Sequence, residues 1–310
     1  MNIIDKNFNN LVKEIKNQSL EEVYQSIRSY FANIPENIQF ALEDYFIKFP
    51  YWGKLNKKEN NYEELFNRAE SLKKHIEDYV WLYNHLQDYR SKKLLFAILN
   101  NWYQFDFDTL NTSIEKNYPH YFDLDIIKSN KDEVIVDLGA YTGDTILDYI
   151  NYYGTENYKK IYCYEITDEI FKILQNNLYH YPNINYQKKA VTDQIGKMYL
   201  HKNSVDHSAN MIDKTGEIEI DTTTIDEDIK EVITLIKMDI EGSEQKALIG
   251  CEKHIKNDHP KLLISVYHNH EDLWKIPKMI ENMFPGYKFY LRYYGNNIFP
   301  TEIVLLGIYE

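Results

Sequence analysis

Cysteine is scarce in this chain, and so are long apolar runs. Only two cysteines, Cys163 and Cys251, occur among 310 residues, which excludes a disulfide framework and is typical of a reducing compartment. The longest aliphatic and aromatic run, residues 94–99, is far shorter than the ~20 apolar residues that span a bilayer. The first residues also lack the apolar stretch of a secretory signal. We therefore expect a cytoplasmic protein with no membrane span.

Positive charge is also in the minority. There are 35 Lys and Arg residues against 48 Asp and Glu, a net charge of -13. Binding to the phosphate backbone of a nucleic acid requires clustered Lys and Arg side chains, so we expect no nucleic-acid partner. The hydrophobic content of 44% and charged content of 27% are ordinary for a globular protein. The length corresponds to two domains at about 150 residues each.

The first 110 or so residues follow helical periodicity. Apolar side chains from Leu20 onwards lie on one helical face, and Ser19 with Glu22 forms a capping box, which predicts a helix to about Asn33. Similar patterns cover residues 38–46, 62–86 and 91–102, the last with Ser91 as its cap. We therefore predict an all-helical N-terminal domain over residues 1–118.

Short β-branched or aromatic runs alternate with helical patterns after residue 130. This alternation predicts an α/β fold with a parallel, doubly wound sheet over residues 119–310. The last two runs have no long helix between them, which favours a closing antiparallel hairpin at the sheet edge. Residues 197–224 depart from the alternation and predict an inserted hairpin or loop. The predicted strands are 134–140, 160–166, 183–191, 235–240, 261–267, 287–293 and 302–309.

The segment VIVDLGAYTGDT, residues 134–145, predicts a ligand-binding turn between a strand and a helix. Ligands of doubly wound sheets bind outside the carboxyl ends of strands, where glycines permit close backbone approach. Two acids in the segment would repel a pyrophosphate, but they suit the ammonium and sulfonium of S-adenosylmethionine. An ordinary tight turn is the alternative. The predicted cofactor-binding residues here are Asp137, Gly139, Ala140, Tyr141, Gly143, Asp144 and Thr145.

Two further residues are candidates for binding an adenosine group. Glu165 follows the second strand, where a carboxylate can accept both hydrogen bonds of a ribose diol. A dinucleotide enzyme would carry the same acid, so Glu165 does not say which cofactor binds. Ala190, after the third strand, is small enough to admit an adenine edge, although a simple turn explains it equally well.

The chain resembles the FkbM family of S-adenosylmethionine-dependent methyltransferases. The matching stretches are DLGAYTGDT, YEITDEIFKILQNNL, LIKMDIEGSEQKALIGCEKHI and LLISVYHNHEDLWKIPKMI. The resemblance covers roughly residues 119–310. It implies a class I methyltransferase, Rossmann-like, seven-stranded sheet with a reversed final hairpin. It also implies S-adenosylmethionine as methyl donor and O-methylation, often on sugars or secondary metabolites.

Asp239 and Glu241 lie at the end of the fourth strand, two residues apart and on one face if the strand extends that far. In the family that the sequence resembles, this position lies between methyl donor and acceptor. Asp239 is therefore expected to touch the methionine end of the cofactor, and Glu241 to face the acceptor. The alternative for Glu241 is that it caps the following helix.

His268 follows the fifth strand, where a general base for a hydroxyl is expected. Its unperturbed pKa of ~6.5 allows it to accept a proton near neutrality. Asp239, Glu241, His268 and Asn269 also offer donors for a divalent ion, but we favour a metal-free site. The predicted catalytic residues are thus His268, Glu241 and Asp239.

The predicted function is O-methylation of a sugar hydroxyl, in glycan or secondary-metabolite biosynthesis, on a small-molecule or glycan acceptor. A metal-assisted O-methyltransferase of a small metabolite is one alternative. A nicotinamide-dependent oxidoreductase is another, but the turn lacks the second glycine of G-x-G-x-x-G. A non-catalytic scaffold is disfavoured by the intact pattern of acids and glycines.

Overall fold

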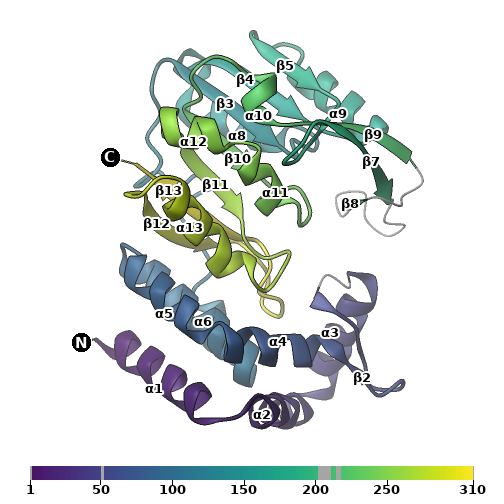
Figure 1. The fold of residues 1–310 in the computed structure, drawn as a ribbon, viewed down its shortest axis with the longest axis vertical. Coiled ribbons are helices and arrows are strands. Elements are labelled where there is room, and N and C mark those ends of the chain that lie inside the picture. The colour runs from purple at the N-terminus through teal and green to yellow at the C-terminus, as the bar shows by residue number, and fades with distance from the viewer. Residues whose placement is uncertain (1, 50–51, 202–210, 214–217, 310) are drawn as a thin grey trace. The chain divides into compact units, whose positions relative to one another are not determined.

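The computed structural model describes residues 2–49, 52–201, 211–213 and 218–309. Figure 1 traces the elements from the purple N-terminal helices to the yellow C-terminal strands. The helices are α1 (Ile3–Asn17), α2 (Leu20–Asn33), α3 (Glu36–Lys48), α4 (Glu63–Lys74), α5 (Ile76–His85), α6 (Tyr89–Gln104), α7 (Phe107–Asn111), α8 (Asp144–Tyr153), α9 (Asp168–Leu178), α10 (Ile225–Asp228), α11 (Glu244–Ile249), α12 (Glu252–Asp258) and α13 (Asp272–Met283), with a 3-10 turn, η2 (Thr155–Asn157).

In the part of the chain that the structure describes, the strands form three sheets. They are β1 (Leu55–Asn56), β2 (Asn61–Tyr62), β3 (Glu133–Leu138), β4 (Tyr158–Tyr164), β5 (Ile184–Gln187), β6 (Ala190–Val191), β7 (Gly196–His201), β8 (Met211–Asp213), β9 (Ile218–Thr223), β10 (Leu235–Met238), β11 (Lys261–Ser265), β12 (Lys288–Tyr293) and β13 (Ile303–Ile308). Among the described residues, no helix combines the length and apolar character needed to cross a bilayer.

The chain divides into two compact units. The first contains Met1–Lys116, Val266–Lys278 and Lys288–Leu305, and the second contains Asn117–Ser265, Met279–Tyr287 and Leu306–Glu310. Segments from the C-terminal part of the chain therefore group with the N-terminal helices. The division into domains at residue 118 stays a prediction.

The central sheet has seven strands in the order β12-β13-β11-β10-β3-β4-β5. The pairs β11/β10, β10/β3, β3/β4 and β4/β5 are all parallel. All six residues of β3 are buried, as expected for a central strand of a parallel sheet that is covered on both faces. The predicted α/β class with a doubly wound sheet is confirmed. The order reverses between β3 and β10, because β4 and β5 lie to one side of β3 while β10 and β11 lie to the other.

The predicted third strand, residues 183–191, is in fact two strands in different sheets. β5 belongs to the seven-stranded sheet, whereas β6 belongs to a four-stranded sheet with the order β6-β9-β7-β8. The intervening lysines carry the chain from one sheet to the other. β7 pairs antiparallel with both β8 and β9, which confirms an excursion between 197 and 224. Residues 202–210 and 214–217 of that excursion lie outside the described residues.

The helix predicted from Leu20 is confirmed. α2 has Ser19 as its N-cap, with the Glu22 N–H donating to Ser19 Oγ at 3.2 Å and the Ser19 N–H donating to Glu22 Oε2 at 2.7 Å. Other details of this region differ from the prediction. The pattern over 62–86 forms two helices, because the chain leaves helical geometry at His75. The region is also not wholly helical, since β1 and β2 form a short antiparallel pair.

The cap predicted for the next helix is wrong. α6 begins at Tyr89, and Asp88 caps it by accepting a hydrogen bond from the Ser91 N–H at 2.7 Å. The side chain of Ser91 is buried and serves another element, because its Oγ accepts from the Leu291 N–H at 2.9 Å. The Asp88 carboxylate also pairs with Arg292 at 2.7 Å. These contacts join α6 to β12 within the first unit.

Candidate functional site

The predicted binding turn closes tightly on the end of the neighbouring strand. The N–H groups of Gly139 and Ala140 both donate to the carbonyl of Tyr164, at 3.1 and 2.9 Å. Gly139 has φ +75°, and a Cβ built on it would lie 1.8 Å from the backbone oxygen of Asp239. Glycine is therefore required here because two loops of the protein approach each other. Gly143, with φ +87°, is the N-cap of α8.

Asp137 is fully buried and forms an ion pair with Lys237 at 3.1 Å. Lys237 also donates from Nζ to the carbonyl of Gly139 at 2.6 Å. Burial raises the pKa of Asp137 to about 6, although Lys237 acts in the opposite direction. Burial alone would lower the pKa of Lys237, but the surrounding carboxylates raise it. The charge of Asp137 is thus offset within the protein, and its direct contact with a cationic cofactor stays a prediction.

Lys237 is a site residue that the sequence analysis did not single out. The signal was present, because a lysine interrupts the otherwise apolar strand β10, whose four residues are all buried. A buried ammonium is costly unless it is paired. The Lys237 side chain, on β10, contacts Asp137 of β3 and the carbonyl of Gly139. It therefore connects the turn at Gly139 to the strand that leads to Asp239.

Glu165 follows β4 and is held by backbone donors. Its Oε1 accepts from the Thr167 N–H at 2.7 Å, and its own N–H donates to the carbonyl of Gln187 at 3.2 Å. Burial raises the pKa of its carboxyl, while hydrogen bonds from nearby N–H groups act in the opposite direction. The carboxylate is thus fixed beside the turn, at the end of the strand next to β3.

The other predicted cofactor residues differ in exposure. Tyr141, with φ 44°, and Asp144 are exposed, whereas Thr145 is buried at the start of α8. Ala190 is buried in β6 and packs in a small apolar cluster with Ile220. Contact of these four residues with an adenosine group remains a prediction.

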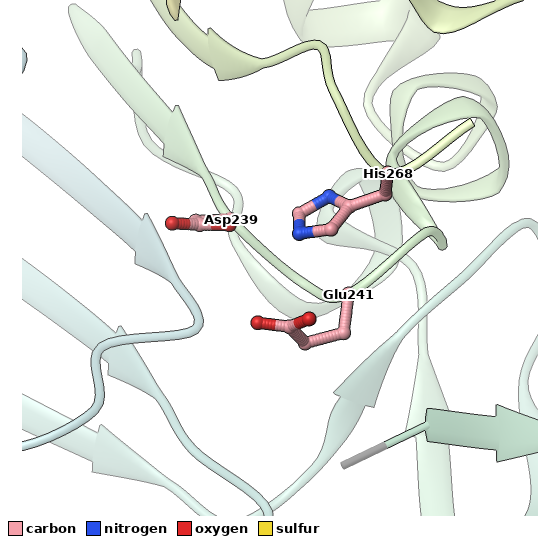
Figure 2. Close-up of side chains that lie close together, drawn as sticks. All are labelled: Asp239, Glu241 and His268. Atoms are coloured by element: carbon pink, nitrogen blue, oxygen red, sulfur yellow. The ribbon is translucent and has the colours of Figure 1, made fainter. Parts of the chain in front are cut away.

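Asp239, Glu241 and His268 lie close together, as Figure 2 shows. One ligand atom of each lies within 4.8 Å of the others. Asp239 directly follows β10, Glu241 takes a left-handed conformation with φ 55°, and His268 is buried. Oxygen and imidazole donors of this kind suit a divalent ion, yet acidic groups often gather without one. Our metal-free interpretation stays a prediction.

The alternative that Glu241 caps a helix is not favoured by the local geometry. α11 begins at Glu244 with Ser243 as its N-cap, so Glu241 lies two residues before the cap. Glu244 closes this turn instead, because its Oε1 accepts from the Ile240 N–H at 2.9 Å.

Tyr121 and His120 join the site from the segment before β3. The Tyr121 hydroxyl donates to Asp239 Oδ2 at 2.6 Å and lies 3.2 Å from Ser265 Oγ. The rings of His120 and Tyr121 stack at 4.0 Å, and burial lowers the pKa of His120 to about 4. No local pattern in the sequence indicates this contact, since the tyrosine lies 118 positions away from its partner.

These features define a doubly wound α/β protein with a glycine turn and acids at the point where the strand order reverses. Residues 137–298 match the family model described as the methyltransferase FkbM domain. The match covers more than half of the chain, which therefore belongs to the FkbM methyltransferase family. No curated protein matches the sequence.

One solved FkbM methyltransferase shares the fold of this chain. A methyltransferase FkbM from Methylobacillus flagellatus is 24% identical with a TM-score of 0.65, over 77% of this chain and 61% of that one. The chain thus spans 61% of the length of that relative. An rRNA methylase from Streptococcus thermophilus is 14% identical over 59% and 90% of the two chains, with a TM-score of 0.36. Fibrillarin from Aeropyrum pernix, with natively bound S-adenosyl-L-methionine, is 12% identical over 58% and 67%, also at 0.36. The last two scores carry no functional weight.

Proposed function

We propose that the protein is an S-adenosylmethionine-dependent O-methyltransferase that acts on a sugar hydroxyl in glycan or secondary-metabolite biosynthesis. The observation that carries the proposal is the gathering of the glycine turn, Glu165 and Asp239 at the carboxyl ends of β3, β4 and β10. These three strands are neighbours in the sheet, and the order reverses among them, where ligands of such sheets bind. Membership of the FkbM methyltransferase family supports methyl transfer as the reaction.

The residues at the strand ends fit the chemistry of the methyl donor. Glu165 offers a fixed carboxylate to the ribose hydroxyls, and the turn at Gly139 and Gly143 offers close backbone approach. The acids Asp144 and Asp239 favour an ammonium and a sulfonium. S-adenosylmethionine, when bound, supplies an electrophilic methyl group.

His268 acts as the general base in this proposal. Its imidazole takes the proton of the acceptor hydroxyl as the oxygen attacks. Asp239 and Glu241, with ligand atoms within 4.8 Å of the ring, stabilise the imidazolium that forms. The same three side chains would hold a divalent ion in the alternative, a metal-assisted O-methyltransferase of a small metabolite.

Two experiments test the function. Calorimetry is expected to detect S-adenosylhomocysteine at micromolar affinity and no binding of NADH; the reverse result would favour an oxidoreductase. Purified protein is then incubated with methyl-tritiated S-adenosylmethionine and separate panels of nucleotide sugars, oligosaccharides and catechols. Label on a sugar oxygen supports the proposal, whereas label on catechols alone, or on none of the panels, contradicts it.

The place of action is proposed from the sequence. Both cysteines are free and buried in the structure, in keeping with a reducing compartment. A cytoplasmic enzyme would meet activated sugars before they are assembled into glycans, so nucleotide sugars are the first panel to test.

A further inference from the structure

Donors from the N-terminal helical region hold the loop that carries His268. This loop connects β11 to α13. The indole Nε1 of Trp52 donates to the carbonyl of Tyr267 at 2.9 Å. The hydroxyl of Tyr79, on α5, donates to the carbonyl of His270 at 3.1 Å. The two bonds therefore fix the backbone on both sides of His268.

The two donors are themselves held firmly. Trp52 is buried, and its backbone carbonyl accepts from Asn67 Nδ2 at 2.8 Å. Tyr79 is fully buried, and its hydroxyl lies 2.7 Å from Ser71 Oγ. The Trp102 ring meets both edge to face, at 5.6 Å from Trp52 and 6.1 Å from Tyr79. Neither donor can change its rotamer without disturbing this packing.

Ring packing adds to the two hydrogen bonds. The His270 ring lies 4.4 Å from Trp52 and 5.4 Å from Trp102. The ion pair of Arg68 and Glu64 is almost completely buried nearby, with the guanidinium 5.9 Å from the Trp52 ring. A buried ion pair is weak evidence for stability, but removing one partner is strongly destabilising, so the pair resists rearrangement. Here it lies under the tryptophan that holds the loop.

The rest of the loop is anchored by its own neighbours. The Val266 N–H donates to the carbonyl of Ile303 at 2.9 Å. Asp272 Oδ2 accepts from the backbone N–H of Asn269 at 2.9 Å and from its side-chain amide at 3.0 Å. The loop is thus bonded on both sides of His268, and the bonds from Trp52 and Tyr79 come from the helical region.

We infer that Trp52 and Tyr79 are positioning residues for His268, so that the N-terminal helical region is part of the catalytic apparatus. The inference rests on the general-base role proposed above for His268. A base must lie within hydrogen-bond reach of the proton that it takes. Misplacement by about 1 Å costs on the order of 10²-fold in rate. The hydrogen bonds of both donors end on backbone carbonyls of the loop, so methyl-donor binding should not depend on them.

The test removes single donor groups and keeps the rings. Trp52→Phe deletes the indole N–H, and Tyr79→Phe deletes the hydroxyl. Tyr83→Phe is the matched control, because this hydroxyl on the same helix donates to Asp5 Oδ1 at 2.7 Å and touches no residue of the loop. Hydrogen exchange of the full-length proteins, read by mass spectrometry, should become at least tenfold faster in the peptide covering residues 266–271 for the first two variants. The control should leave that peptide unchanged.

Kinetics with the sugar that accepts label in the assay proposed above complete the test. Both variants should lower kcat by roughly 10- to 100-fold while the KM for S-adenosylmethionine changes less than twofold. Uniformly faster exchange along the chain, or unchanged exchange in the loop, would overturn the inference, as would an unchanged kcat. A wild-type protein that transfers no methyl group would instead overturn the proposed function. The exchange data alone would then decide whether the donors hold the loop.

Discussion

Substitution of the single residue His268, together with chelation, distinguishes base catalysis from metal catalysis. If it is the base, His268→Ala should lower kcat by ~10²–10⁴-fold. The affinity for S-adenosylhomocysteine should stay nearly constant, because in this mechanism the imidazole contacts the acceptor and not the methyl donor. Turnover of the wild type should rise with pH through one ionisation, and a chelator should have no effect. Steady-state kinetics between pH 5 and 9 check this.

The opposite pattern identifies a metal. If a divalent ion is held by Asp239, Glu241 and His268, exhaustive chelation should abolish activity and added Mg²⁺ or Mn²⁺ should restore it. Restoration would contradict the metal-free interpretation. Full activity in both chelated wild type and His268→Ala would contradict both mechanisms.

Glu165 allows a test of the cofactor site that needs no acceptor. Glu165→Gln should weaken S-adenosylhomocysteine binding about tenfold, because a neutral amide accepts weaker hydrogen bonds from the ribose diol than a carboxylate does. Glu231→Gln is the control, since that acid precedes β10 at the opposite end of the strand and pairs with Lys160 at 2.8 Å. Calorimetry measures both. Equal affinities in Glu165→Gln and wild type would remove Glu165 from the site.

Replacement of Gly139 is expected to lower the stability of the fold as well as cofactor binding. The Cβ of Gly139→Ala would lie 1.8 Å from the Asp239 carbonyl oxygen, and φ is +75°. Overpacking and left-handed strain together should cost about 2–4 kcal/mol in the free energy of unfolding. In Gly196→Ala the nearest atom is 3.8 Å away, so that control should change stability little. Urea unfolding of the two variants compares them, and an unaffected Gly139→Ala would mean that the two loops can separate freely.

The residues of the turn can be predicted from the sequence, but the partner of the Asp137 carboxylate cannot. The sequence favours Asp137 as a ligand for a cation, because a strand end with an acid and a glycine faces a pocket in this fold. Its partner is Lys237, one strand away in the sheet and 100 positions later in the chain. A pairing of this kind depends on strand register, which a single sequence does not encode locally.

At the scale of elements, α2 shows when local sequence is sufficient. Its capping box satisfies backbone donors within four residues, so the start of the helix needs no tertiary contact. Ser19→Ala should lower the free energy of unfolding by about 1 kcal/mol. Ser29→Ala, an exposed site inside the same helix, should have almost no effect. Thermal or urea unfolding measures both, and equal losses would argue against the cap.

Other elements were beyond local sequence. The break at His75 has no glycine or proline to mark it; the His75 ring stacks on Trp274 at 4.4 Å and its Nδ1 lies 2.9 Å from Asp78. Ser91 looked like a cap, but it is used by β12, 200 positions away. Residues 183–191 do form β-strands, but β5 and β6 belong to different sheets. In each case tertiary partners decided between conformations that the local pattern left equally favourable.

For the whole molecule, two histidines predict loss of stability in mild acid. Burial lowers the pKa of His120 to about 4 and that of His270 to about 3. In the unfolded chain a histidine has a pKa of ~6.5, so below that pH the unfolded state binds more protons than the folded state. Stability is therefore fully present above pH ~6.5 and is lost as pH falls towards 4. Between pH 7 and 5 the loss should be about 1–2 kcal/mol per histidine.

Urea unfolding at several pH values checks this expectation. His120→Phe keeps the stack on Tyr121 while removing the titrating group, so the dependence on pH should become shallower by one proton. His180→Phe replaces an exposed ring and is the control. If the slope between pH 7 and 5 is the same in His120→Phe and wild type, His120 does not resist protonation in the folded state.

The bond from Trp52 to the Tyr267 carbonyl spans 215 positions, and that from Tyr79 to the His270 carbonyl spans 191. On the ribosome, at about 5–20 residues per second, the acceptors follow their donors by roughly 10–40 s. During that interval the N-terminal helices lack the segments Val266–Lys278 and Lys288–Leu305 that complete their compact unit. Their apolar faces must stay exposed or be shielded by a chaperone until Leu305 has been synthesised. The helical part, which leaves the ribosome before the sheet, is thus among the last parts of this chain to become fully packed.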